Sequence, residues 1–132
     1  MEFHVEAGPK TRCYIESILP SMLTQLGLDR SRRLLMIKLD RELEDLGSTI
    51  PMEGIDTYLV VLRPTKNLLN LGITLAHELT HVAQFAQGTL KVAPRGKKWR
   101  GKFYPNGYPY LKQPWEIQAF AKQEIVFRRA IS

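Results

Sequence analysis

One apolar segment that carries two histidines constrains this chain more than any other feature. Residues 67–88 read NLLNLGITLAHELTHVAQFAQG. The apolar side chains recur at steps of three and four residues, which is the spacing of one face of an α-helix. Asn67 is a suitable N-cap, and Gly88 can end the helix in a left-handed conformation. The sequence therefore predicts a helix between them, with an apolar stripe made of Leu68, Leu71, Leu75, Leu79, Val82 and Ala86.

This predicted helix carries His77 and His81, four residues apart, with Glu78 next to the first. One turn brings both imidazoles to the same side, roughly 6 Å apart along the axis. Two histidines at this spacing can bind one zinc ion. Glu78 is rotated from His77 by about 100°, so its carboxylate can reach a water on the metal and act as a general base. H-E-x-x-H is the pattern of zinc metalloproteases.

A catalytic zinc site uses three protein ligands, so two histidines leave one to be found. Glu116 and Glu124 are the downstream candidates, because no histidine follows His81. They are eight residues apart, about 12 Å along a helix, and cannot both bind one ion. We prefer Glu116, because burial of Trp115 would anchor the first turn of the last helix. His4 is a weaker candidate that is expected to face solvent from a short strand.

The rest of the chain predicts a small sheet and two further helices. One helix is expected over residues 11–26, where Pro20 should kink or divide it, and the last helix begins at Pro114. Residues 40–54 read as a polar connection with one or two helical turns at 41–46. Apolar runs predict strands at 3–6, 34–39, 57–62 and 89–92, and residues 94–102 form a basic loop or hairpin.

Length and composition indicate a single globular domain over residues 1–132. The one cysteine, Cys13, is expected to be buried in the first helix. The N-terminal residues have no apolar signal core, and no apolar run is long enough to span a membrane. We therefore expect a cytoplasmic protein, in the host cytoplasm if a phage encodes it, with no membrane contact.

Two groups of residues carry a resemblance to a known class of enzyme. Residues 77–82, with Gln84 and Gly88, resemble the active-site helix of small zincin-type metallopeptidases. Residues 114–119 follow downstream and resemble the pattern in metallopeptidases of phages and bacteria, which are relatives of the glutamate-zincin and SprT-like groups. Trp99, Gly101, Tyr104 and Tyr110 belong to the same downstream pattern.

The resemblance covers about residues 57–127 and implies both a fold and a site. The fold would be α+β, a minimal zincin-like domain with a small β-sheet packed on the HExxH helix and a C-terminal helix. The site would hold Zn²⁺ through His77, His81 and Glu116, with Glu78 as the base. The chain departs from the pattern at Gln118, where the family often has an acid, and it lacks the third histidine of SprT-like proteins.

The expected function is that of a zinc-dependent metallopeptidase acting on a protein or peptide substrate. A hydroxyl of Tyr104, Tyr108 or Tyr110 would stabilise the oxyanion. The alternative is a zinc-containing module without turnover, either structural or associated with nucleic acid. The nucleic-acid-associated module is suggested by the net charge of +6 and by the basic residues at 95–102. This segment would make weak contact with nucleic acid, and Trp99 would stack on a base.

Overall fold

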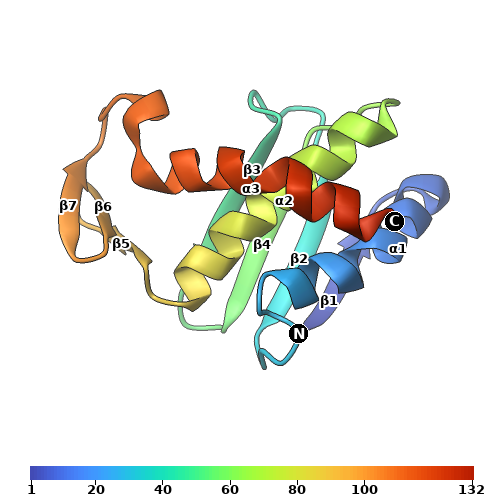
Figure 1. Ribbon diagram of the computed structural model, residues 1–132, viewed down its shortest axis with the longest axis horizontal. Coiled ribbons are helices and arrows are strands. Elements are labelled where there is room, and N and C mark those ends of the chain that lie inside the picture. The colour runs from blue at the N-terminus through green and yellow to red at the C-terminus, as the bar shows by residue number, and fades with distance from the viewer.

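The computed structural model describes residues 1–132 and confirms the expected α+β architecture. Three α-helices accompany seven strands in two separate sheets (Figure 1). The strands are β1 (Glu2–Glu6), β2 (Leu34–Leu39), β3 (Gly47–Met52), β4 (Thr57–Leu62), β5 (Leu90–Ala93), β6 (Gly96–Trp99) and β7 (Lys102–Pro105). The helices are α1 (Pro9–Gln25), α2 (Leu68–Ala86) and α3 (Pro114–Ala130), with a 3₁₀ turn η1 (Tyr110–Lys112) before α3.

The larger sheet has the strand order β1-β2-β4-β3, with β1, β2 and β4 parallel and β3 antiparallel at the edge. The three helices lie on one face of this sheet (Figure 1). Alternate strand residues point toward the helices and form the main core with them. These inward residues include Val5, Leu35, Ile37, Tyr58, Val60 and Leu62.

Edge strand β3 was not expected, because residues 40–54 read as a polar connection. Residues 41–46 form turns and bends rather than the expected helical turns. Gly47 and Pro51 are unusual strand residues, so the sequence gives no clear strand signal here. The backbone of β3 nevertheless pairs with β4 along its whole length. The register places Gly47 opposite Leu62 and Thr49 opposite Val60. Gly47 and Thr49 therefore point toward α2.

Helix α2 forms as the sequence predicts. Asn67 is the N-cap, and its side chain accepts a hydrogen bond from the backbone N–H of Asn70. Gly88 follows the helix with φ of 75°. The middle of the apolar stripe is buried in the core, whereas Leu68 at its start is exposed.

Helix α1 differs from expectation in two respects. It is one helix from Pro9 to Gln25, so Pro20, which lies inside it, does not divide it. Cys13 is exposed rather than buried. The buried face of α1 is centred on Ile15, Leu19 and Met22, and Cys13 lies on the opposite side of the helix.

Helix α3 packs across α2, and a glycine makes the close approach possible. A Cβ at Gly72 would lie 2.1 Å from Cε1 of Phe127. Only a residue without a side chain lets the Phe127 ring lie against α2 at this point. This contact fixes where α3 crosses α2, and therefore where the first turn of α3 lies.

The second sheet is antiparallel, in the order β5-β6-β7, and confirms the expected basic hairpin. Arg100 and Gly101 make its second turn with φ of 50° and 84°. Leu90 and Trp99 lie on the inner face and form a small second core with Trp115. In the whole structure, no helix has the length and apolar character needed to cross a bilayer.

Candidate metal centre

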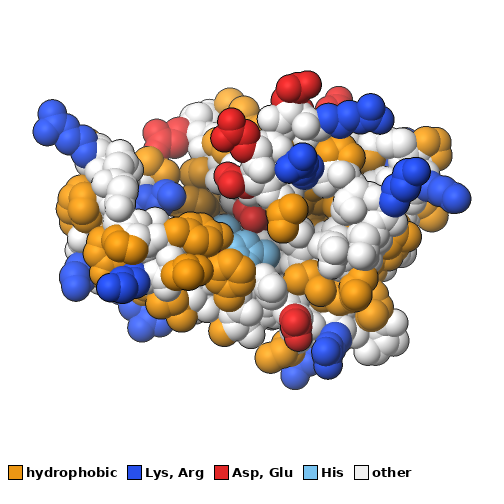
Figure 2. Space-filling view, turned by 90° about the horizontal axis from the view of Figure 1, so that it is seen from above, with side chains coloured by type: hydrophobic (Ala, Val, Ile, Leu, Met, Phe, Trp, Pro, Cys, Tyr) orange, Lys and Arg blue, Asp and Glu red, His pale blue; other side chains and the backbone are white.

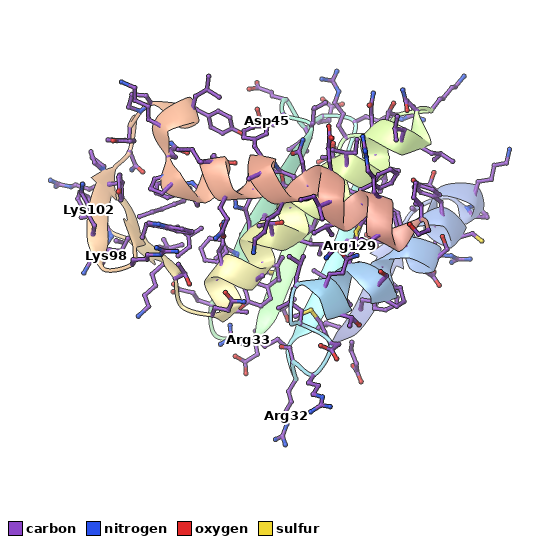
Figure 3. All side chains as sticks on the ribbon, in the orientation of Figure 1. Arg32, Arg33, Asp45, Lys98, Lys102 and Arg129 are labelled. Atoms are coloured by element: carbon purple, nitrogen blue, oxygen red, sulfur yellow. The ribbon has the colours of Figure 1, made fainter.

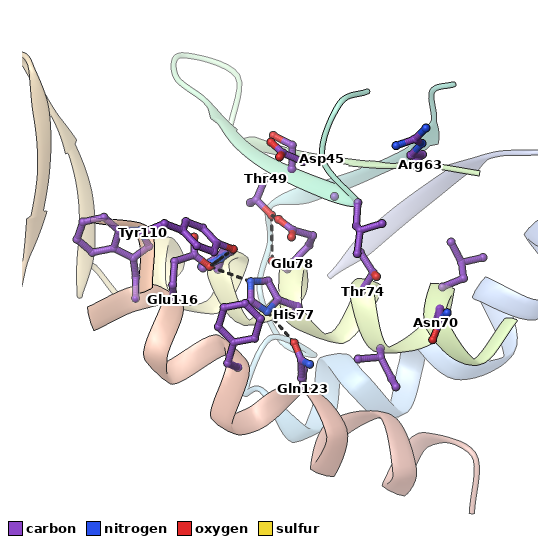
Figure 4. Close-up of a pocket in the computed structure, with 18 of the residues that line it drawn as sticks. Asp45, Thr49, Arg63, Asn70, Thr74, His77, Glu78, Tyr110, Glu116 and Gln123 are labelled. Carbon is purple, nitrogen blue, oxygen red and sulfur yellow. Dashed lines mark hydrogen bonds and ion pairs between the residues drawn. The ribbon is translucent and has the colours of Figure 1, made fainter. Parts of the chain in front are cut away.

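Two helices bring His77, His81 and Glu116 together. The Nε2 atoms of His77 and His81 lie 2.9 and 3.0 Å from the same oxygen, Oε1 of Glu116. Figure 4 shows the contact between His77 and Glu116. One ligand atom each from His77, Glu78 and His81 also lie within 4.8 Å of one another. Glu124 instead lies on the surface beside Arg128, and His4 is exposed on β1. Of the three candidates for a third ligand, the structure brings only Glu116 to the histidines.

The other ring nitrogens are held by glutamines. Nδ1 of His81 donates to Oε1 of Gln84 at 2.8 Å. The orientation of the Gln84 amide is not arbitrary, because its Nε2 donates to the Trp115 carbonyl at 3.0 Å and to Oε1 of Gln118 at 2.9 Å. Nδ1 of His77 donates to Oε1 of Gln123 at 2.8 Å. Both imidazoles therefore direct Nε2 toward Glu116, as the nitrogen that would bind a metal.

The donor set suits zinc. Two imidazole nitrogens and one carboxylate oxygen are common zinc ligands, and three protein ligands leave one position open. Tetrahedral ligation at about 2.0–2.2 Å separates ligand atoms by roughly 3.3–3.6 Å. Glu116 Oε1 lies 2.9 and 3.0 Å from the two nitrogens, so each of these two distances needs to lengthen by only about half an ångström.

The structure supports Glu78 from strand β3. Thr49 donates its hydroxyl to Oε1 of Glu78 at 2.8 Å (Figure 4). A Cβ at Gly47 would lie 2.8 Å from Cγ of Glu78 and 2.9 Å from Cγ2 of Thr74. The edge strand thus leaves space for the Glu78 side chain and holds its carboxylate beside the histidines.

Burial and mutual hydrogen bonding change the protonation of the site. Burial raises the pKa of Glu78, and the nearby imidazoles and Thr49 oppose it only in part. Burial also acts to raise the pKa of Glu116, but hydrogen bonds from His77 and His81 outweigh it and lower this pKa to about 2. Burial lowers the pKa of His77, yet its hydrogen bonds with Glu116 and Gln123 leave the pKa raised overall.

The site lies in a cleft of about 980 Å³ between β3 and helix α3. Figure 2 shows the histidine at the base of a hollow with hydrophobic side chains gathered on its rim. Phe120 lies edge-on to the His77 ring, and the two ring centroids are 4.7 Å apart. Arg63 and Lys97 are the cations that line the cleft.

The three candidate tyrosines have different positions. Tyr110 lines the cleft and donates its hydroxyl to Oε1 of Glu116 at 3.3 Å. Burial, together with the charge of Glu116, raises the pKa of Tyr110 to about 12. Tyr104 and Tyr108 instead pack against each other, and Tyr104 also packs against Trp115. Only Tyr110 has its hydroxyl at the candidate centre.

Sequence reasoning did not identify Thr49 or Gln123. Thr49 lay in a segment that was not recognised as a strand, so nothing placed it near α2. Helical spacing could have predicted the position of Gln123, because Glu116, Phe120 and Gln123 follow one another at steps of four and three residues. That spacing puts all three on the face of α3 that lies over His77.

No protein-family model, curated protein or solved structure matches the chain. The function of the site is therefore argued from its own geometry.

Proposed function

We propose that the protein is a zinc-dependent peptidase that hydrolyses peptide bonds in a protein or peptide substrate. One observation carries the proposal. The two Nε2 atoms of His77 and His81 converge on a single oxygen of Glu116, beside a Glu78 carboxylate that contributes to none of these contacts. A centre that served only to stabilise the fold would not require this additional buried acid.

The zinc would be held by His77, His81 and Glu116, and when bound it would polarise a carbonyl and lower the pKa of a water. Glu78 accepts the proton of the attacking water and passes it to the leaving amine. Its raised pKa suits both steps, because the carboxylate is a stronger base than an ordinary glutamate and holds the proton until the leaving amine takes it. Thr49 holds one oxygen of Glu78, which directs the other toward the substrate.

The Tyr110 hydroxyl is the donor best placed to stabilise negative charge that develops on the carbonyl oxygen. It stays protonated at neutral pH, because its pKa is raised to about 12. Its present partner is Glu116 Oε1 at 3.3 Å, a long hydrogen bond that it can exchange for a better one.

The cleft has a volume of about 980 Å³, which lies within the range of ligand-binding clefts. Exposed apolar side chains on its rim, such as Phe120, favour substrates with apolar residues near the cleaved bond. The proposal includes a cytoplasmic location.

Glu78→Gln tests the catalytic role. Glutamine keeps the size of the side chain and an oxygen for Thr49 but cannot accept the proton. We expect unchanged zinc content and thermal midpoint, with turnover of an unfolded protein substrate lower by roughly 10²–10⁴-fold. Glu124→Gln, on the exposed surface of α3, is the matched control and should keep the wild-type rate.

Two results would contradict the proposal. Wild-type turnover in Glu78→Gln would exclude Glu78 as the base. Zinc bound by the wild type without cleavage of any member of a panel of folded and unfolded proteins would favour a structural centre.

A further inference from the structure

The positive charge of the chain is concentrated in one segment. Residues 79–115 hold seven of the 19 Lys and Arg and none of the 13 Asp and Glu, so the rest of the chain carries 12 cations against 13 acids. None of the seven forms an ion pair with a carboxylate. Most of them belong to the small β5–β6–β7 sheet, which lies at the end of the molecule opposite α1 (Figure 3).

The pairing of the strands aligns part of this charge on the outer face of the sheet. Lys91 lies directly opposite Lys98, and Lys98 lies directly opposite Phe103. All three are exposed, and their neighbours Leu90 and Trp99 point to the other face and are buried. Like charges directly opposite each other on a sheet are unfavourable, and a bound anion would relieve this repulsion.

A recess next to this row has the composition of an anion site. It measures about 240 Å³ and is lined by Lys91, Lys98, Gly88, Thr89 and Gly101, with no acidic and no apolar residue. Two ammonium groups beside small residues, which leave the backbone accessible, can accommodate a phosphate group.

Phe103 places an aromatic ring beside the same row. Its side chain is 45% exposed. A Cβ at Gly96 would lie 2.9 Å from Cε1 and Cζ of the Phe103 ring, so the ring lies over the Gly96 backbone. The sheet thus holds the ring on one side, and the other side is available to a ligand.

We propose that this outer face, composed of Lys91, Lys98 and Phe103, binds single-stranded nucleic acid. A backbone phosphate lies between the two lysines, and an unpaired base stacks on Phe103. A duplex is disfavoured, because its bases are already stacked on each other. Trp99, the aromatic residue expected from sequence to stack, is buried in the small core and cannot do so. The proposal is independent of peptidase activity, because Lys97 and the cleft lie on the other face.

Fluorescence anisotropy with a labelled oligo(dT) of about 12 nucleotides tests the proposal. A fully abasic strand of the same length is the second probe, because it has the phosphates without the bases. We expect Lys91→Gln with Lys98→Gln to weaken binding of both probes and to reduce the slope of log affinity against log salt by about 0.7, the value for one neutralised phosphate of a single strand. Lys122→Gln, on exposed α3, is the matched control and should change neither.

Phe103→Leu separates stacking from charge, since leucine can still cover Gly96. It should weaken oligo(dT) binding by roughly five- to 150-fold, the equivalent of about 1–3 kcal/mol for one stacked base, and leave abasic binding unchanged. Phe103→Tyr should restore oligo(dT) binding. Circular dichroism on each variant checks that the sheet is intact.

Three outcomes would overturn the proposal. The wild type could show no salt-sensitive binding of oligo(dT) at low ionic strength. Oligo(dT) and the abasic strand could bind equally, with Phe103→Leu silent, which would indicate a surface for polyanions such as anionic lipid or acidic protein. Lys122→Gln could weaken binding as much as the paired lysine variants, which would make the attraction diffuse.

Discussion

A proton on Nε2 of His77 would compete with the proposed zinc ion for the same lone pair. The pKa of His77 is raised above its ordinary value of 6.5 by hydrogen bonds with Glu116 and Gln123, against the effect of burial. Without metal, the charged imidazole therefore stabilises the fold fully below about pH 6.5, and this contribution is lost as pH rises through the raised pKa. Zinc needs the deprotonated nitrogen, so its affinity should rise over the same range.

We therefore predict opposite pH trends for two measured quantities. Above about pH 6.5, the thermal midpoint of chelator-treated protein should fall with rising pH while zinc affinity rises. Glu116 does not contribute to the trend, because its pKa of about 2 keeps it charged throughout this range. Thermal melts and competition titrations in the same buffers measure both, and parallel trends would exclude the His77–Glu116 pair as the competing group.

Thr49 adjusts the protonation of Glu78 from outside the HExxH motif. Its hydrogen bond lowers the pKa of Glu78 and so opposes the effect of burial. Thr49→Val keeps the shape but removes the hydroxyl, so the acid limb of kcat/KM should move to higher pH by on the order of one unit. Thr49→Ser retains the hydroxyl and should keep the wild-type profile. A valine variant with an unshifted acid limb would show that Thr49 does not act on the base.

At the scale of elements, the crossing of α3 over α2 delivers Glu116 to the histidines. Alanine in place of a helical glycine usually stabilises a protein by about 0.5–1 kcal/mol. At Gly72 the opposite is expected, because the new Cβ would lie 2.1 Å from the Phe127 ring. Gly72→Ala should destabilise the fold by about 1–3 kcal/mol and lower zinc affinity as α3 shifts.

Chemical denaturation and zinc titration of Gly72→Ala measure both effects. Phe127→Leu provides the control, since a smaller side chain relieves the clash. The double variant should be more stable than the sum of the two single changes predicts. A stabilised Gly72→Ala, or strictly additive changes, would show that the helices can separate without consequence for the site.

The elements that the sequence revealed are those with strong local signals. Helix α2 has a regular apolar period and a cap at each end, and both survive in the structure. Strand β3 lacked such a signal, because Gly47 and Pro51 are poor strand formers and its pairing with β4 is non-local. The exposure of Cys13 on α1 was missed for a related reason. Its position around the helix, away from the buried face, determines its exposure, whereas the prediction relied on residue type.

Some residues of the candidate site could likewise be predicted from local sequence, and others depend on tertiary packing. The positions of His77, Glu78 and His81 follow from helical geometry alone, so the sequence was sufficient for them. Spacing could not choose between Glu116 and Glu124, because the choice depends on where α3 crosses α2. The contribution of Thr49 depends on a strand register that no local pattern encodes.

At the scale of the whole molecule, the candidate centre joins side chains from three elements that are distant in the sequence. His77 and His81 come from α2, Glu116 from the first turn of α3, and Thr49 from the edge of the sheet. Metal bound only by the folded state adds its binding free energy to the free energy of unfolding. Removal of zinc should therefore loosen the first turn of α3 and lower the thermal midpoint of the whole domain.

Zinc content measured by elemental analysis, on wild type, Glu116→Gln and Glu124→Gln from the same preparation, tests the metal centre most directly. We predict one zinc per chain in wild type and Glu124→Gln, with a thermal midpoint that falls when a chelator is added. Glu116→Gln should bind zinc more than roughly 100-fold more weakly, since loss of even an outer hydrogen-bond partner costs about 10–100-fold. A wild-type protein without zinc, or a Glu116→Gln variant with a full complement at limiting zinc, would contradict the proposed centre.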